Sequence, residues 1–202
     1  MKRTLPVFIT ILALSAFIYP LFSDSRYVLI FGNSAQIAGL IFALLQFLHL
    51  ANISMKSDPL HSAWVRCAFG VFVWLIAQLL EFYCEMVLNL IAYGTIADAF
   101  WVIGYFPLIL GFHSVVKHAM AGAETFTGKW MLLFFSAAYV ILFVFLILPQ
   151  WQHPQTWGEA VLDFAYPTFD FILLTQAFLV MKSTGSGKPL FRFALLAQAS
   201  FL

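Results

Sequence analysis

The sequence predicts an all-α protein, a polytopic bundle of transmembrane helices with six full spans and the start of a seventh. Two observations carry this prediction. Of 202 residues, 63% are hydrophobic and only 9% are charged, whereas a soluble domain has about 25% charged residues. The apolar residues also form runs of about 17 to 25 residues, the length that crosses a bilayer. A soluble enzyme and a nucleic-acid binder are disfavoured, the latter because the net charge is only +1.

Short loops rich in Gly, Pro, Ser and charged residues separate the apolar runs. The predicted spans are Leu5–Phe22, Tyr27–Leu50, Ala63–Leu88, Ile96–Val116, Trp130–Leu148 and Gly158–Met181. We interpret the first as a retained span, because it contains Tyr19 and Pro20 and lacks the cleavage site of a signal peptide. A last apolar stretch runs from Leu190 to Leu202 and is too short to span. Residues 1–202 are therefore predicted to form one membrane domain that stops inside its seventh span.

The basic residues predict the orientation of the bundle. With a cytoplasmic N-terminus, nine of the ten Lys and Arg residues fall on the cytoplasmic side and only Arg26 falls outside. This asymmetry is the one that the positive-inside rule requires. Several tryptophans also fall near predicted span ends, as interfacial aromatic residues do; they are Trp64, Trp130, Trp151 and Trp157.

The acidic residues gather toward the other side. A carboxylate at the depth of a span costs at least ~2.5 kcal/mol, so it should face the bundle interior or water. In three spans, polar and aromatic residues recur at spacings of three and four, which places each set on one helix face. These rows are Trp74–Gln78–Glu81–Glu85–Asn89, Asp98–Trp101–Tyr105 and Glu159–Asp163–Tyr166–Asp170. We expect the three rows to converge on a polar cavity that opens to the outside.

The candidate ligand-binding residues of this cavity are Gln78, Glu81, Asp98, Trp101, Tyr105, Asp163, Tyr166 and Asp170. Protons and hard cations suit carboxylates better than soft metals do. Capping of a helix N-terminus is the alternative role for Asp98 and Asp163. Solvation at the membrane interface is the alternative for Glu85 and Glu159. Glu81 and Asp170 lie deeper and away from helix starts, which favours an interior role.

Histidine and cysteine offer little chemistry in this sequence. His49 and His113 lie at comparable depth, where they would hold a b-type haem if their helices touched; the alternative is that each bonds only to a neighbour. Cys67 and Cys84 are 17 residues apart in one predicted helix, or about 25 Å, and cannot bond to each other. Metal, nucleophile and phosphate-loop motifs are missing, so we expect no catalysis and no metal site in this chain.

Two segments resemble a known group of proteins. Ile96–Leu108 (IADAFWVIGYFPL), followed by Gly111, and the later Asp163–Asp170 (DFAYPTFD) resemble recurring segments of bacterial and archaeal signalling proteins. In that group, a multi-span N-terminal membrane region precedes histidine-kinase or diguanylate-cyclase modules. The resemblance covers about Trp74 to Met181, and Phe106 departs from it by separating Tyr from Pro. It implies a sensory region in a prokaryotic inner membrane, followed by cytoplasmic output modules.

Three functional hypotheses follow. In the first, a small ligand, cation or proton binds in the cavity, and the resulting helix shift passes inward to output modules. In the second, the chain is a transporter or channel fragment in which Asp170 takes part in proton or cation movement. In the third, His49 and His113 hold a haem. The expected partners are the lipid bilayer and the signalling modules; a homodimer is left open, and no nucleic-acid partner is expected.

Overall fold

The computed structural model describes residues 25–89, 94–120, 136–137, 139–141, 143–144 and 157–183. Its long helices are α2 (Ser25–Ile53), α3 (Pro59–Met86), α4 (Ile96–Met120) and α7 (Trp157–Ser183). The all-α fold class is confirmed, and the described residues contain no β-strand. The predicted first span, Leu5–Phe22, and the stretch from Leu190 lie outside the described residues, as does most of Trp130–Leu148.

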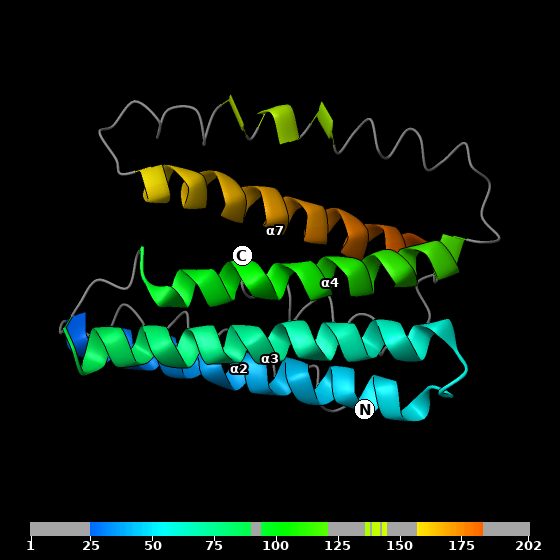
Figure 1. Cartoon of the computed structure of the whole chain (residues 1–202), viewed down its shortest axis with the longest axis horizontal. Helices are drawn as coiled ribbons and strands as arrows, with labels where there is room; N and C mark the ends of the chain where they lie inside the picture. The colour runs from blue at the N-terminus through cyan, green and yellow to red at the C-terminus, as the bar shows by residue number, and fades with distance from the viewer. Residues whose placement is uncertain are drawn as a thin grey trace.

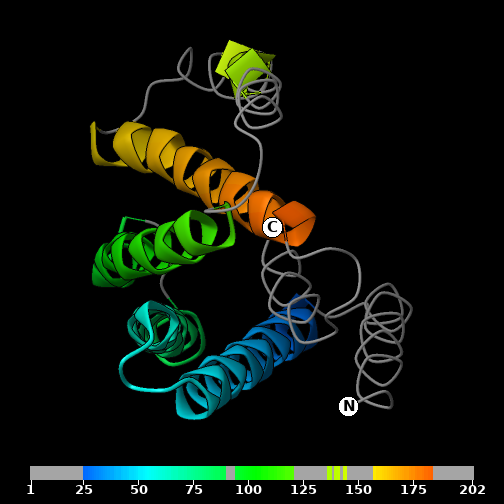
Figure 2. The same cartoon turned by 90° about the vertical axis from the view of Figure 1, so that its right-hand side faces the viewer.

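The four helices pack in chain order. α3 lies between α2 and α4, and α4 also packs against α7 (Figure 1). α3 runs antiparallel to α2 and α4, whereas α7 runs in the same direction as α4 (Figure 1). The end-on view in Figure 2 shows the same succession of helices. As a result, the starts of α2, α4 and α7 and the end of α3 meet at one end of the bundle, which we call the α4-start end.

Among the described residues, three helices are long and apolar enough to cross a membrane. They are Arg26–Ile53, Pro59–Met86 and Ile96–His118. Large apolar side chains on their outer faces are exposed, among them Leu45, Phe69 and Ile103. A surface of this kind is a liability in water and is suited to contact with lipid. The length and the surface of these helices therefore agree with association with a membrane.

Side-chain caps determine where α3 and α4 begin. Asp58 caps α3 with its side chain, and Pro59 takes the first helical position, where no N–H is needed. At the start of α4, the Thr95 hydroxyl accepts a hydrogen bond from the Ala97 N–H at 3.3 Å. Asp98 Oδ2 accepts one from the Thr95 N–H at 2.9 Å. These two bonds form a capping box.

The end of α3 corrects one prediction. The predicted span runs to Leu88, but the helix ends at Met86 and Val87 is its C-cap residue. Asn89 follows with a φ of 51°, in the left-handed region that Asn tolerates better than most residues. Asn89 therefore lies beyond the helix and does not continue the row of Trp74 and its neighbours.

α3 and α4 approach closely along a seam of small residues. A Cβ atom added to Gly111 would lie 2.5 Å from Cys67 Sγ, and one added to Gly104 would overlap the indole of Trp74. Glycine is required at both positions because the two backbones are too close for a side chain. Cys67 is buried in this seam and is a free thiol, as is Cys84, which agrees with the prediction that the two do not pair.

Candidate functional site

A set of hydrogen bonds joins all four helices between the α4-start end and the middle of the bundle. The residues that form it are Asn33, Gln78, Glu81, Glu85, Asp98, Trp101, Tyr105, Tyr166 and Asp170. We call these nine residues the polar network. It includes seven of the eight residues that the sequence predicts as ligands; the eighth, Asp163, is half-buried one turn before Tyr166, and its role stays a prediction.

Asn33 connects α2 to α3. Its Nδ2 donates to Glu85 Oε2 at 2.8 Å, and its Oδ1 accepts from Gln78 Nε2 at 2.6 Å. Asn33 is 7% exposed and Gln78 is 1% exposed, so both amides need hydrogen-bond partners inside the protein. Asn33 Nδ2 also donates to the Leu29 carbonyl at 3.0 Å. The sequence analysis did not select Asn33. The available signal was a polar amide within the apolar run Tyr27–Leu50.

Two tryptophans connect α3 to α4. The Trp101 indole N–H donates to Glu81 Oε2 at 3.1 Å, and the Trp74 indole N–H donates to the Trp101 carbonyl at 2.9 Å. The two rings lie 5.6 Å apart. Trp74 thus packs on the α4 backbone at the seam that Gly104 opens, and this packing positions Trp101 next to the Glu81 carboxylate.

Two tyrosine–aspartate bonds connect α4 to α7 in a reciprocal way. Tyr105 of α4 donates its hydroxyl hydrogen to Asp170 of α7, with 2.5 Å between the oxygens. Tyr166 of α7 donates to Asp98 of α4. Each helix therefore supplies one donor and one carboxylate to the same interface. Charge-assisted bonds of this kind are stronger than those between neutral groups.

Asp98 performs two roles at once. Its Oδ2 belongs to the capping box of α4, while its Oδ1 accepts the hydrogen bond from Tyr166. The capping alternative is therefore confirmed for Asp98, and the same carboxylate also joins α4 to α7. Because it is 8% exposed, Asp98 connects the start of α4 directly to the packing of the bundle.

The row on α3 contacts two neighbouring helices, α2 and α4. At 100° per residue, Trp74, Gln78, Glu81 and Glu85 lie within about 60° of one another. They point toward the boundary between α2 and α4, so their long side chains divide between the two helices. Gln78 and Glu85 bond to α2, and Trp74 and Glu81 approach α4. The expected convergence of three rows thus holds between α4 and α7 and only in part for α3.

The two histidines of the haem hypothesis do not lie in the buried core of the bundle. His49 and His113 are both exposed. Their neighbours Phe47 and Phe112 are buried, and these rings contact each other edge to face with centroids 6.1 Å apart. The described residues also contain no group of three or more His, Cys, Asp and Glu side chains that would hold a metal ion. The geometry therefore gives the haem hypothesis no support.

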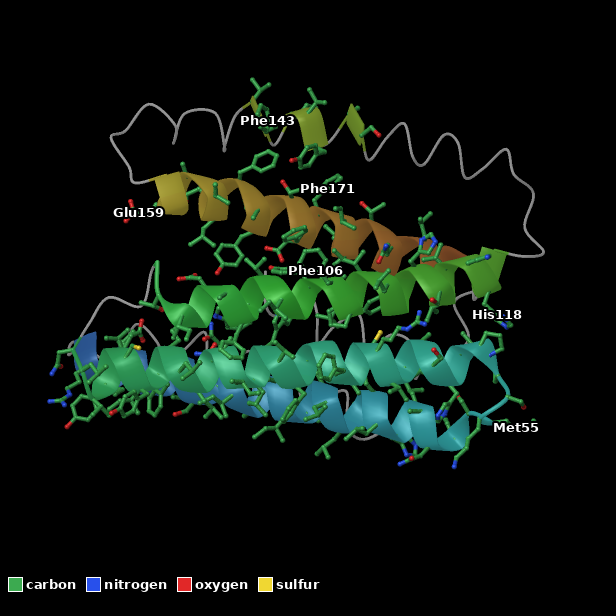
Figure 3. All side chains as sticks on the ribbon, viewed as in Figure 1. Met55, Phe106, His118, Phe143, Glu159 and Phe171 are labelled. Atoms are coloured by element: carbon green, nitrogen blue, oxygen red, sulfur yellow. The ribbon has the colours of Figure 1, made fainter. Side chains whose placement is uncertain are left out.

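Charge separates along the bundle. Figure 3 labels Glu159 at the α4-start end and Met55 and His118 at the opposite end. The carboxylates of the polar network lie between the α4-start end and the middle of the bundle. The basic side chains Lys56, Arg66 and Lys117 lie in the opposite half, with Arg26 and Asp58 as exceptions on either side. The separation expected from the sequence is therefore present within the described helices.

No family model matches this chain, and none of the curated proteins or solved structures compared with it is similar. The polar network is therefore interpreted from its own chemistry. Its three carboxylate bonds between α3, α4 and α7 use neutral donors, namely a tryptophan indole and two tyrosine hydroxyls. A proton or cation that binds to one of these carboxylates weakens it as an acceptor for the donor on the neighbouring helix.

Proposed function

We propose that this chain is the signal-input domain of a membrane-embedded sensor. A proton, a small cation or a small ligand is the stimulus, and the polar network is where it acts. The observation that carries the proposal is the reciprocal pair of bonds between α4 and α7, Tyr105 to Asp170 and Tyr166 to Asp98. The resemblance of Ile96–Leu108 to signalling proteins points to the same function.

The mechanism follows from what the bonds connect. The tyrosine and the aspartate of each bond lie on different helices, so a change at one carboxylate alters the packing of α4 against α7. A stimulus shifts such an interface only if it binds one packing of the helices better than the other. Protonation or cation binding at Asp98 or Asp170 meets this condition, because it weakens the carboxylate as an acceptor for tyrosine.

The orientation is part of the proposal. We propose six full spans, the start of a seventh, and a cytoplasmic N-terminus in a prokaryotic inner membrane. Nine of ten basic residues on one side support this arrangement. The network then lies toward the outside, and α4 and α7 carry its changes to the cytoplasmic side, where output modules would follow.

The test is a fusion of the full chain to a cytoplasmic diguanylate-cyclase reporter. The reporter output is measured while the external pH and the concentrations of Na⁺, K⁺ and Mg²⁺ are varied. We expect a response in the wild-type chain and its loss in Glu81→Gln and in Asp170→Asn, with normal insertion of both variants. Tyr83→Phe is the control, since Tyr83 is 52% exposed on α3 and outside the network. Normal responses in both carboxylate variants would contradict the proposal.

A transporter or channel is the second candidate, and the position of Asp170 near the middle of α7 favours it. Carboxylates at such depth are common in proton and cation pathways. Proteoliposomes that contain a pH-sensitive dye distinguish the two functions. A sensor leaves the internal pH unchanged after an external pH step, whereas sustained proton flux that is lost in Asp170→Asn would favour the transporter.

A further inference from the structure

Two basic side chains lie on the outer faces of α3 and α4, toward the end of the bundle opposite to the polar network. They are Arg66 of α3 and Lys117 of α4, and both are exposed. Figure 3 labels His118 at this end. We call Arg66 and Lys117 the basic pair. None of the nine residues of the polar network belongs to it.

Arg66 connects α3 to α4 through a neutral partner. Its guanidinium donates to Ser114 Oγ at 3.3 Å. Ser114 uses its own hydroxyl hydrogen for the Leu110 carbonyl at 2.9 Å, so it is only an acceptor for Arg66. A guanidinium has five N–H donors, and this is the one hydrogen bond that Arg66 makes with the described residues. Most of its donors, and its charge, are therefore open to an anion.

The described residues of this half contain little negative charge. Asp58 is the only acidic residue among them, and its Oδ1 already caps the start of α3. Lys117 makes no hydrogen bond or ion pair with the part of the chain that the structure describes. A counter-charge for the basic pair is therefore available only from outside the described residues.

Arg66 belongs to a helix and not to a loop. It lies seven residues after Pro59, about 10 Å along α3, in a helix that is long and apolar enough to cross a membrane. Its neighbours Val65 and Phe69 are exposed and suited to contact with lipid. A charged side chain on such a face is costly unless it finds a polar partner.

The Arg66 side chain extends toward the end of the bundle. Cys67 and Gly111 face each other across the seam between α3 and α4, and Ser114 lies three residues beyond Gly111 toward the end of α4. By bonding to Ser114, Arg66 directs its guanidinium away from the apolar part of α3. Long basic side chains near the ends of spanning helices reach the level of the lipid phosphates in this way.

The outer face of α4 changes from apolar to basic along its length. Exposed residues recur on it at every third or fourth position. They are Ile103, Phe106, Leu110, His113 and Lys117. Ser114 lies beside this row, so the bond from Arg66 joins the outer faces of α3 and α4 into one surface. This surface has an apolar part and a basic end, as a lipid has acyl chains and a head group.

We propose that this surface binds an anionic phospholipid, with the phosphate on the basic pair and the acyl chains along the exposed apolar residues of α3 and α4. Arginine presents paired N–H donors to a phosphate, and lysine adds a point charge. Lys117 lies three residues beyond Ser114, about 4.5 Å further along α4. Basic sites between spanning helices bind anionic head groups in this manner. The proposal rests on the basic pair and does not depend on the proposed function.

The test uses the purified full chain in a mild detergent, with bound lipid molecules counted by native mass spectrometry. The probes are phosphatidylglycerol and phosphatidylcholine with the same acyl chains. We expect phosphatidylglycerol to bind about fivefold more tightly or better, because its phosphate is not neutralised by a choline group. Inorganic phosphate in large excess should not displace it, because free phosphate lacks the acyl chains. Equal binding of the two lipids, or full displacement by phosphate, would overturn the proposal.

Variants of the basic pair locate the site. Arg66→Gln and Lys117→Gln should each weaken phosphatidylglycerol binding about fivefold or more. Arg66→Lys keeps the charge but loses the paired donors, so its affinity should lie between those of the wild type and Arg66→Gln.

Lys56→Gln is the matched control. Lys56 is exposed in the connection between α2 and α3 and belongs to neither outer face, so the variant should bind phosphatidylglycerol within about twofold of the wild type. Equal weakening by all three glutamine variants would indicate a diffuse positive surface and would overturn the site. Wild-type affinity of Arg66→Gln would do the same, with circular dichroism confirming the helical content of each variant.

Discussion

At the scale of single residues, Asn33 has an influence that its position in the sequence does not suggest. It lies in an apolar helix, yet it is the residue that bonds to both Gln78 and Glu85. Its amide satisfies one donor and one acceptor of α3 together. Loss of the side chain would leave two buried or half-buried polar groups without a partner, which is a larger effect than the loss of one bond.

We therefore expect Asn33→Ala to lower the free energy of unfolding by about 1–3 kcal/mol. Unfolding by SDS in mixed micelles, followed by circular dichroism, measures this change. Asn52→Ala is the matched control, because Asn52 is exposed on the same helix, and it should change the stability by less than about 0.5 kcal/mol. Equal stability of the two variants would show that the α2–α3 bonds are not important for folding.

Tyr105 is the second residue with a measurable role. Tyr105→Phe keeps the ring, which packs 4.8 Å from Trp74 and 5.1 Å from Phe169, and removes only the bond to Asp170. We expect Tyr105→Phe to lower the free energy of unfolding by about 1–2 kcal/mol. Tyr83→Phe on the exposed face of α3 is the control.

A double-mutant cycle with Asp170→Asn tests whether the Tyr105 effect acts through this bond. Tyr105→Phe should lower the free energy of unfolding less when Asp170 is already replaced. The interaction free energy between the two substitutions should be about 1 kcal/mol. Additive effects of the two substitutions would contradict the bond as the source of the stability.

At the scale of helices, the seam between α3 and α4 depends on glycine. Gly104→Ala introduces a Cβ atom into the space of the Trp74 indole. The helices have to separate or Trp74 has to move, which costs about 1–3 kcal/mol. The displaced indole would also change Trp fluorescence. The cost is measured as the change in the free energy of unfolding, and the movement of the indole is measured by the fluorescence emission spectrum.

The matched substitution is Gly32→Ala on α2, where an added Cβ atom meets nothing within 4 Å. It should keep the wild-type spectrum and leave stability unchanged or raise it by up to about 1 kcal/mol, because Ala favours the helix. A wild-type emission spectrum and undiminished stability of Gly104→Ala would contradict the close approach of α3 and α4 at this position.

At the scale of the whole molecule, the proposed orientation has a direct test. Arg26→Cys and Lys56→Cys are made separately in a chain whose Cys67 and Cys84 are replaced by alanine. In intact cells, an impermeant maleimide should label Arg26→Cys and leave Lys56→Cys unlabelled until the membrane is opened. The reverse pattern would mean that the bundle is inserted the other way up, despite its basic residues.

The sequence by itself determined the fold class and most of the helices, because apolar runs of bilayer length have few alternatives. The helices α2, α3, α4 and α7 coincide closely with four of the predicted spans, and the first three of them are long and apolar enough to cross a membrane. The end of α3 was missed, since Leu88 continues the apolar run and Asn89 continues the row, while the backbone has already left the helix. The periodicity of a sequence shows which residues are apolar or polar, but it does not show where the last backbone hydrogen bond of a helix forms.

Only the tertiary structure decided how the polar residues pair. The rows contain eight of the nine members of the polar network, seven of which are candidate ligands, because a spacing of three and four places residues on one face of any helix. Asn33 and the reciprocal Tyr–Asp bonds depend on which helices are neighbours and on how far each long side chain reaches. These are properties of the packed bundle.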